Sequence, residues 1–292
     1  MYCKHYGFAE KPFDVTPKPK FLFLTRGHRE ALATLLYGIR ERRGFIAMVG
    51  DAGTGKTTLL RAAIERLGKK TRHALLFNSE MPFEDVILVI LDELKLLRKG
   101  ETLTKLQAVK RLTRFAIRLF AKGGNLVIII DEAQNFSRET LEGLRMISNL
   151  ESNNYKLIQI VIAGQVELDR KLDNYGLRPF VQRINLKRYV KQLNERETYA
   201  YLAHRLRVAS YRGPSIFDKT AQQMIWGYSG GVPRKINNIC DNALLHGYGL
   251  DAQTISGRVI TEVVRDLGYA AVKMADEKPR RKLIPLRKVA MY

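Results

Sequence analysis

Short runs of apolar residues alternate with segments of helical periodicity between residues 27 and 164. The apolar runs are GFIAMVG, HALLFN, NLVIII and KLIQIVIAG. Strands that are apolar throughout are typical of a parallel sheet buried on both faces by helices. We therefore expect an α/β domain in which these strands alternate with helices at about 27–41, 56–68, 83–97, 104–122 and 137–150.

From about residue 190 onward the pattern contains only helices, at about 194–209, 218–228, 233–247 and 256–266. Asn194 and Glu197 have the spacing of a capping box at the start of the first of these helices. The expected fold class is therefore α/β: a parallel-sheet domain over residues 27–189, followed by a small all-helical domain over residues 190–268.

The two ends of the chain differ in composition. Residues 1–26 are rich in proline and aromatic residues, which disordered segments rarely are, so we expect an ordered, extended arm. Residues 269–292 are basic, contain two prolines and show little periodicity. We expect this end to form a flexible basic tail.

The chain of 292 residues has a formal net charge of +21, and 46% of its residues are hydrophobic. That charge favours a polyanionic partner, either nucleic acid or an anionic membrane surface, although a basic surface without a partner is also open. Cys3 and Cys240 have no metal-ligand spacing and indicate a reducing compartment. Without a membrane-spanning apolar run or a signal peptide, we expect a cytoplasmic protein.

The stretch GDAGTGKTT follows the first predicted strand and opens the helix after it. It fits G-x-x-x-x-G-K-[ST], a phosphate-binding loop whose backbone N–H groups hold phosphate oxygens at a helix N-terminus. Lys56 is expected to reach the β- and γ-phosphates of ATP, and the Thr57 hydroxyl to bind Mg²⁺. The expected nucleotide-binding residues are Gly50, Asp51, Ala52, Gly53, Thr54, Gly55, Lys56, Thr57 and Thr58.

Two adjacent acids follow the third predicted strand, in LVIIIDEAQ. Ligands of open parallel sheets bind at the carboxyl ends of the strands, where Asp131 and Glu132 are expected to lie. Asp131 can join Thr57 in holding Mg²⁺, while Glu132 can polarise an attacking water. The two motifs together predict an ATP–Mg²⁺ site that hydrolyses ATP.

These residues resemble the AAA+ ATPases, and more narrowly the ExeA/GspA family, whose core is similar to that of transposition regulators of the TniB/TnsC type. The narrower likeness rests on MYCKHYGFAEKPFDVTPKPKFLF, GDAGTGKTTLLR, IIIDEAQNFS, VIAGQVELDRKL, LRPFVQRINL and SGGVPRKINNICDNALLHGY. It extends to about residue 268. The resemblance implies a P-loop AAA+ domain and a helical lid.

The resemblance also implies roles for residues outside the two motifs. Gln165 matches the sensor-1 position, which would contact the γ-phosphate or the attacking water. Asn78 corresponds to a polar residue that restrains the catalytic glutamate. Arg183 matches the arginine finger, with Arg178 as the alternative, and Arg234 matches sensor 2 in the lid. On the residues alone, Gln165 is equally an ordinary strand-end amide, and Arg178 and Arg183 are equally surface charges.

An arginine finger acts on the nucleotide of a neighbouring subunit, so the resemblance implies a homo-oligomer, either a ring or a helical filament. Arg234 carries an argument of its own. It follows Pro233, which suits the first turn of a helix, where a cation is unfavourable beside the positive end of the helix dipole. That conflict is resolved if Arg234 faces a triphosphate.

Four basic residues follow a 3–4 spacing along the helix predicted at 104–122 and would form one stripe, namely Lys110, Arg111, Arg114 and Arg118. Contact with the DNA backbone, a solvated helix face and contact with anionic lipid are all open. No base-reading motif is present, so DNA binding would be sequence-tolerant and salt-sensitive.

Two roles are open for such an ATPase. Longer ExeA/GspA members carry a transmembrane helix and a peptidoglycan-binding region and serve secretion machinery, and this chain shows neither, which favours a short form. The role is then either assembly of secretion or pilus complexes, or ATP-dependent DNA binding in the regulation of transposition. A stand-alone metabolic kinase is a weaker alternative, because it would need neither the lid nor the finger.

Overall fold

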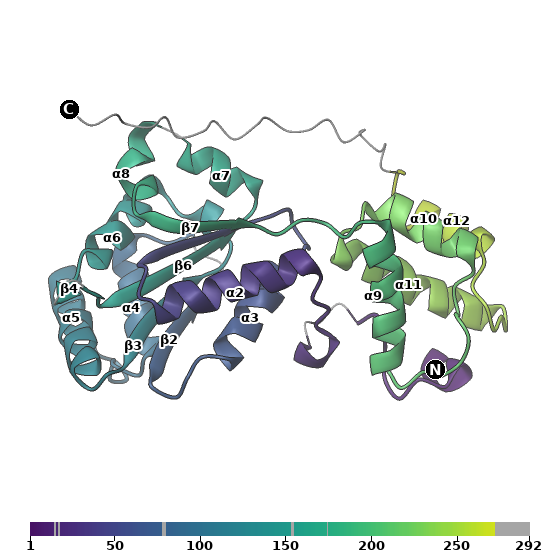
Figure 1. Ribbon diagram of the computed structural model, residues 1–292, viewed down its shortest axis with the longest axis horizontal. Coiled ribbons are helices and arrows are strands. Elements are labelled where there is room, and N and C mark those ends of the chain that lie inside the picture. The colour runs from purple at the N-terminus through teal and green to yellow at the C-terminus, as the bar shows by residue number, and fades with distance from the viewer. Residues whose placement is uncertain (15, 17, 78–79, 153–154, 174, 272–292) are drawn as a thin grey trace, which may run out of the picture.

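The computed structural model describes residues 1–271 apart from 15, 17, 78, 79, 153, 154 and 174. An α/β domain lies at one end of the molecule and a helical domain at the other (Figure 1). The predicted basic tail and Asn78 lie outside the described residues, apart from the tail's first three positions.

A five-stranded parallel sheet forms the centre of the α/β domain, with strand order β2-β3-β6-β1-β7. Because all strands run the same way, their carboxyl ends share one edge of the sheet and their starts share the opposite edge. The strands are β1 (Phe45–Val49), β2 (Thr71–Leu76), β3 (Asn125–Ile130), β6 (Ile158–Gly164) and β7 (Ile184–Tyr189), with a separate antiparallel pair, β4 (Glu151–Ser152) and β5 (Tyr155–Lys156).

Helices cover both faces of the sheet, as the apolar strands predict. Successive side chains of a strand point to opposite faces. Phe45 and Ala47 therefore join one core cluster, while Ile46 and Met48 join another. The helices of this domain are α2 (Arg26–Arg40), α3 (Lys56–Glu65), α4 (Phe83–Glu93), α5 (Lys105–Ala121), α6 (Arg138–Ser148), α7 (Val166–Leu172) and α8 (Arg178–Val181), with 3-10 turns at Ala133–Asn135 and Tyr175–Leu177.

The helical domain packs around a third apolar cluster. Its first helix begins with the predicted capping box, since Asn194 accepts from the backbone N–H of Glu197 at 2.8 Å and Glu197 accepts from that of Asn194 at 3.1 Å. Its helices are α9 (Glu195–Val208), α10 (Lys219–Ser229), α11 (Pro233–Gly249) and α12 (Gly257–Asp266).

The N-terminal arm packs against the helical domain, and the N-terminus lies beside it in Figure 1. Tyr6, Phe13 and Phe21 of the arm are buried in the same cluster as the helices α9–α12. The prediction of an extended arm is wrong for its first turn, because Tyr2–Tyr6 form helix α1, and Pro19–Phe21 form a 3-10 turn. Its aromatic residues are core residues of the helical domain.

Several elements differ from the sequence-based expectation, among them α7, α8 and the β4–β5 pair, none of which was predicted. Strand β7 was not predicted, because its INLKRY sequence is polar and only partly buried at the edge of the sheet. Helix α4 ends at Glu93 and does not continue to about residue 97. Two residues after its end, Lys95 adopts a left-handed φ of 58°. The residues between Glu93 and Lys105 connect α4 to α5.

Candidate nucleotide-binding site

The loop from Gly50 to Gly55 joins the end of β1 to the start of α3. Gly53 and Gly55 have φ of 78° and 100°, a left-handed backbone conformation that residues other than glycine rarely adopt. A Cβ on Gly50 would lie 2.4 Å from the carbonyl oxygen of Val190. These glycines therefore allow the tight backbone path of the loop between β1 and α3.

Lys56 lies at the base of this loop and is 4% exposed. Its Nζ donates to the carbonyl oxygens of Gly50 at 2.8 Å and Asp51 at 3.0 Å. Burial lowers the pKa of Lys56, against the opposing effect of the nearby carboxylates of Glu132 and Asp131. The cation is thus held by carbonyls of the loop itself, and its contact with the β- and γ-phosphates stays a prediction.

Thr57 and Asp131 meet between α3 and β3. The Thr57 hydroxyl donates to Asp131 Oδ2 at 2.5 Å, and Asp131 Oδ1 accepts from the backbone N–H of Glu132 at 3.0 Å. Burial raises the pKa of Asp131, while the hydrogen bond from Thr57 opposes that rise. A hydroxyl beside a buried carboxylate is a donor set of hard oxygens that fits Mg²⁺.

Glu132 is held by amides from two segments. Its Oε2 accepts from Gln134 Nε2 at 2.6 Å and from Gln165 Nε2 at 3.0 Å, and the backbone N–H of Gln165 donates to Gln134 Oε1 at 3.0 Å. Burial acts to raise the pKa of Glu132, but these hydrogen bonds and the charge of Lys56 outweigh it, so the pKa is lowered. Glu132 is therefore an ionised carboxylate in a fixed position.

Gln134 is a site residue that sequence reasoning missed. Its only signal is its place in DEAQ, two residues after Glu132. The turn there makes the contact possible, because Glu132 has φ of 54° and a 3-10 turn follows at once. Asn78, expected to restrain the same glutamate, lies outside the described residues.

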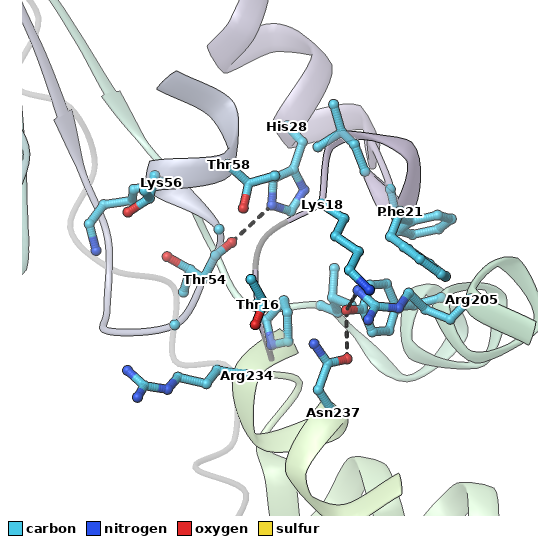
Figure 2. A pocket seen from close by; sticks show the side chains of 18 of the residues that line it. Thr16, Lys18, Phe21, His28, Thr54, Lys56, Thr58, Arg205, Arg234 and Asn237 are labelled. Atoms are coloured by element: carbon cyan, nitrogen blue, oxygen red, sulfur yellow. Dashed lines mark hydrogen bonds between the residues drawn. The ribbon is translucent and has the colours of Figure 1, made fainter. Parts of the chain in front are cut away.

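Arg234 comes from the helical domain but lies against the phosphate-binding loop. Its backbone N–H donates to the Gly53 carbonyl at 3.3 Å, and a Cβ on Gly53 would lie 2.8 Å from the Arg234 Cβ. It occupies the first turn of α11, directly after Pro233, as expected. Figure 2 shows its exposed guanidinium extending away from Asn237 and past the loop.

A cavity of about 400 Å³ opens between the loop, the arm and the helical domain (Figure 2). Its walls combine aromatic rings, hydroxyls and cations, which suits a ligand with an apolar ring system and polar substituents. The lining includes Asp14, Thr16, Lys18, Phe21, Phe23, His28, Thr54, Tyr201, Arg205, Pro233, Arg234 and Asn237.

His28 ties α2 to the phosphate-binding loop. Its Nε2 lies 3.1 Å from the Thr54 carbonyl, which can only accept, so Nε2 carries the proton. Its Nδ1 then accepts from the Thr25 hydroxyl at 2.7 Å. Burial lowers the pKa of His28, which keeps the imidazole neutral while both of its nitrogens form hydrogen bonds.

Arg205 fixes the arm on the opposite wall of the cavity. Its guanidinium donates to the carbonyls of Pro12 at 2.5 Å and Asp14 at 2.9 Å, and to the Tyr201 hydroxyl at 3.3 Å. It also lies 4.4 Å from the ring centroid of Phe21. This buried cation thus connects α9 to the arm at the edge of the cavity.

Arg183 and Arg178 do not lie with the residues above. Arg183 precedes β7, whose first residue pairs with Phe45 at the start of β1, whereas the phosphate-binding loop follows the end of β1. Five residues of strand separate the two edges by about 16 Å. Arg183 therefore lies toward the sheet edge opposite to the loop. Arg178 begins α8 and is exposed.

The basic stripe of α5 has one member fewer than predicted. Lys110, Arg114 and Arg118 are exposed. Arg111 instead faces the α4–α5 connection, where it donates to both carboxylate oxygens of Glu101 at 2.6 Å and to the Leu96 carbonyl at 3.1 Å. Its assignment to the stripe is wrong, because its charge is already matched by Glu101.

Within the described residues, none of the helices combines the length and apolarity needed to cross a membrane.

Comparisons with known proteins identify relatives of this chain. Residues 39–172 match the model of the AAA domain. Over 255 residues, 87% of the chain, the sequence is 36% identical to general secretion pathway protein A of Aeromonas hydrophila. The chain spans 46% of the length of that relative.

Solved structures show the same fold at low sequence identity. Cdc6p of Pyrobaculum aerophilum has a TM-score of 0.70 at 17% identity, covering 87% of this chain and 70% of that one. The Aeropyrum pernix ORC2 protein, in its ADPNP–ADP complexes, has a TM-score of 0.65 at 19% identity, covering 88% and 71%. Drosophila ORC bound to DNA has a TM-score of 0.66 at 17% identity, covering 90% and 65%.

Proposed function

This chain belongs to the AAA+ family of P-loop proteins and is related to general secretion pathway protein A, and on that premise we propose that it binds ATP with Mg²⁺ and hydrolyses it. The observation that carries the proposal is the fixed carboxylate of Glu132, held by Gln134 and Gln165. It lines the same cavity as Lys56 and the other residues of 53–58.

Each residue of the loop has a part in this proposal. The backbone N–H groups of residues 50–58 hold the phosphate oxygens, and Lys56 neutralises charge on the β- and γ-phosphates. Thr57 and Asp131 hold Mg²⁺, which neutralises charge between those phosphates when it is bound. The aromatic and polar walls of the cavity take the base and ribose.

Glu132 accepts a proton from the attacking water, whose oxygen forms the new bond to the γ-phosphorus as the bond to the leaving ADP oxygen breaks. Its lowered pKa keeps it ionised and ready to accept. Gln165 orients this carboxylate and, in this proposal, contacts the γ-phosphate or the attacking water, while Arg234 adds positive charge from the lid. Arg183, or Arg178 as the alternative, stabilises the transferring phosphoryl group of a neighbouring subunit.

The experiment that tests the proposal compares Glu132→Gln with Lys56→Ala. Glu132→Gln keeps the shape of the side chain but cannot accept the proton, so kcat should fall by about 10²-fold or more while ATP still binds. Lys56→Ala should weaken ATP binding itself. Steady-state hydrolysis and fluorescent-ATP binding, measured on both variants, separate the two effects. Unchanged kcat in Glu132→Gln would refute this assignment.

Two cellular roles are open for this ATPase, and a different observation supports each. The relationship to general secretion pathway protein A supports a role in assembling secretion or pilus complexes. The exposed cations Lys110, Arg114 and Arg118 support contact with a DNA backbone, as in a regulator of the TniB/TnsC type, and one structural neighbour is bound to DNA. Binding of duplex DNA with ATP, with ADP and without nucleotide discriminates them. No ATP-dependent binding at low salt would remove the DNA role.

A further inference from the structure

A group of exposed cations lies at the edge of the sheet where the strands begin, remote from the nucleotide cavity. The loop before β1 carries Arg43 and α2 ends just before it at Arg40, the loop before β2 carries Lys69 and Lys70, and the loop before β3 carries Lys122. All five are exposed. Because the strands are parallel, these segments meet at one edge, and we call the five residues the start-edge patch.

The members of the start-edge patch are not matched by neighbouring acids. Within the part of the chain that the structure describes, none of the five has a carboxylate oxygen within the 4.0 Å that defines the other ion pairs. Glu41 and Glu65 are the exposed acids of the same edge, and Glu151 there is paired with Lys156. The patch therefore keeps an excess of positive charge.

The backbone beneath the patch is held rigidly by Arg42. Its guanidinium donates to the Gly124 carbonyl at 2.6 Å and to Asn125 Oδ1 at 3.3 Å, and lies 4.8 Å from the centroid of Phe120. The Asn125 amide donates to the Ile39 carbonyl at 2.7 Å, and the Asn125 backbone N–H donates to the Lys70 carbonyl at 3.1 Å. The start of β3, the end of α2 and the loop before β2 thus form one fixed platform.

Helix capping explains part of this charge and leaves the rest unexplained. Arg40 lies in the last turn of α2 and Lys122 is the C-cap of α5, where a cation complements the helix dipole. That effect fades beyond the last turn. Arg43, Lys69 and Lys70 lie past the C-caps Glu41 and Arg66.

The patch has the character of a phosphate-backbone contact and not of a membrane anchor. Among the described residues, the loops 41–44, 67–70 and 122–124 carry no exposed large apolar side chain for insertion into a bilayer, and the exposed Tyr37 beside them accepts a hydrogen bond from Arg43 through its hydroxyl. From β2 to β1 the patch spans three strand spacings, or about 14 Å. A DNA duplex presents about eight phosphates over that length.

We propose that the start-edge patch binds the sugar–phosphate backbone of duplex DNA, without reading sequence. That the partner is DNA rests on the DNA role proposed above. The new part is the place of the contact, which is the edge of the sheet and not α5 alone. Its position leaves the nucleotide cavity free, because the cavity lies at the opposite edge of the sheet.

The test measures binding of the full chain to a labelled duplex of arbitrary sequence at several salt concentrations. Removing three cations in the Lys69→Ala/Lys70→Ala/Lys122→Ala variant should make the slope of log affinity against log salt about 2.7 less negative, since each phosphate contact contributes about 0.9. The matched control removes three exposed cations of the helical domain, Arg207→Ala/Arg212→Ala/Lys219→Ala, and should leave the slope unchanged.

Three outcomes would overturn the inference. If only Lys110→Ala/Arg114→Ala/Arg118→Ala weakens binding, the backbone lies on α5 and the DNA role survives without the start-edge patch. If the wild type binds vesicles containing anionic lipid but not DNA, the partner is a membrane. If the wild type binds neither, the DNA role fails as well. ATP hydrolysis, measured in parallel, should be unaffected by the start-edge substitutions, so failure of the ATPase proposal is seen separately.

Discussion

The carboxylate of Glu132 shows how one side chain is prepared for proton transfer. It would be a weaker acid if burial acted alone, but the amides of Gln134 and Gln165 donate to it and lower its pKa. The same amides fix its direction. Side chains that orient a reacting group can contribute as much to a rate as those that react.

We expect Gln134→Leu to move the pH dependence of hydrolysis. Removing the 2.6 Å hydrogen bond raises the pKa of Glu132, so the acid limb of the kcat–pH profile should shift to higher pH. Looser positioning should also lower the maximal kcat, by roughly tenfold. Asn135→Ala, an exposed neighbour, is the control. An acid limb that stays in place would show that Glu132 does not set it.

At the scale of elements, α5 separates two kinds of basic residue on one helix. Lys110, Arg114 and Arg118 face solvent, whereas Arg111 turns toward the α4–α5 connection and binds Glu101 through two hydrogen bonds. The hydrogen bonds from Arg111 lower the pKa of Glu101 to about 2. Regular spacing along the sequence conceals this division of roles.

Substituting Arg111 should therefore lower the stability of the protein, whereas substituting Lys110 should not. Arg111→Ala is expected to lower the urea midpoint of unfolding, since the connection loses its contacts to Glu101 and Leu96, and to leave DNA affinity nearly unchanged. Lys110→Ala should leave the midpoint unchanged. The stabilisation by Glu101 is present above the carboxyl's unfolded pKa and is lost as the pH falls toward about 2. Equal midpoints for both variants at pH 7 would contradict the assignment.

The sequence predicted the elements with strong apolar patterns and missed elements whose residues are largely polar. Strands β1, β3 and β6 were predicted because their residues are buried and apolar on both faces, and β2 was predicted from the apolar residues of its second half, ALL. Strand β7 was missed because the edge of the sheet tolerates the polar residues of INLKRY.

The phosphate-binding loop and the acids after β3 are motifs with fixed spacing, so their place in the site could be predicted. Gln134 could not, since its contact depends on the left-handed turn at Glu132. The Arg111–Glu101 pair depends equally on a tertiary contact that no spacing reveals.

At the scale of the whole molecule, the nucleotide cavity is built by three parts of the chain. The arm, the α/β domain and the helical domain each contribute walls. Arg205 joins the arm to α9, and His28 joins the start of α2 to the loop at Thr54.

Arg205→Met should therefore weaken ATP binding without touching the phosphate-binding loop. Loss of the hydrogen bonds to Pro12 and Asp14 is expected to lower the free energy of unfolding by about 2 kcal/mol and to raise the KM for ATP. Limited proteolysis should cut faster within residues 1–25. Arg207→Met, which changes an exposed arginine on the same helix, is the control. Equal KM values in the two variants would argue against a role for the arm in the cavity.

The proposed oligomer can be tested by mixing two inactive variants. Arg183→Ala keeps its own phosphate-binding loop, and Lys56→Ala keeps its own finger. If the finger acts between subunits, mixed assemblies contain interfaces with both groups intact, and hydrolysis should recover on mixing. Repeating the mixture with Arg178→Ala identifies which arginine acts. Activity that stays absent from every mixture would contradict action between subunits.

The path of the chain limits how the helical domain can move. The chain passes between the two domains twice, once at the end of the arm between Phe23 and Thr25 and once between Tyr189 and Asn194 (Figure 1). A body attached at two points retains a single easy rotation, about the line through both. Any movement of the helical domain is therefore expected to be a rotation about that line, which a distance measured across the cavity would report.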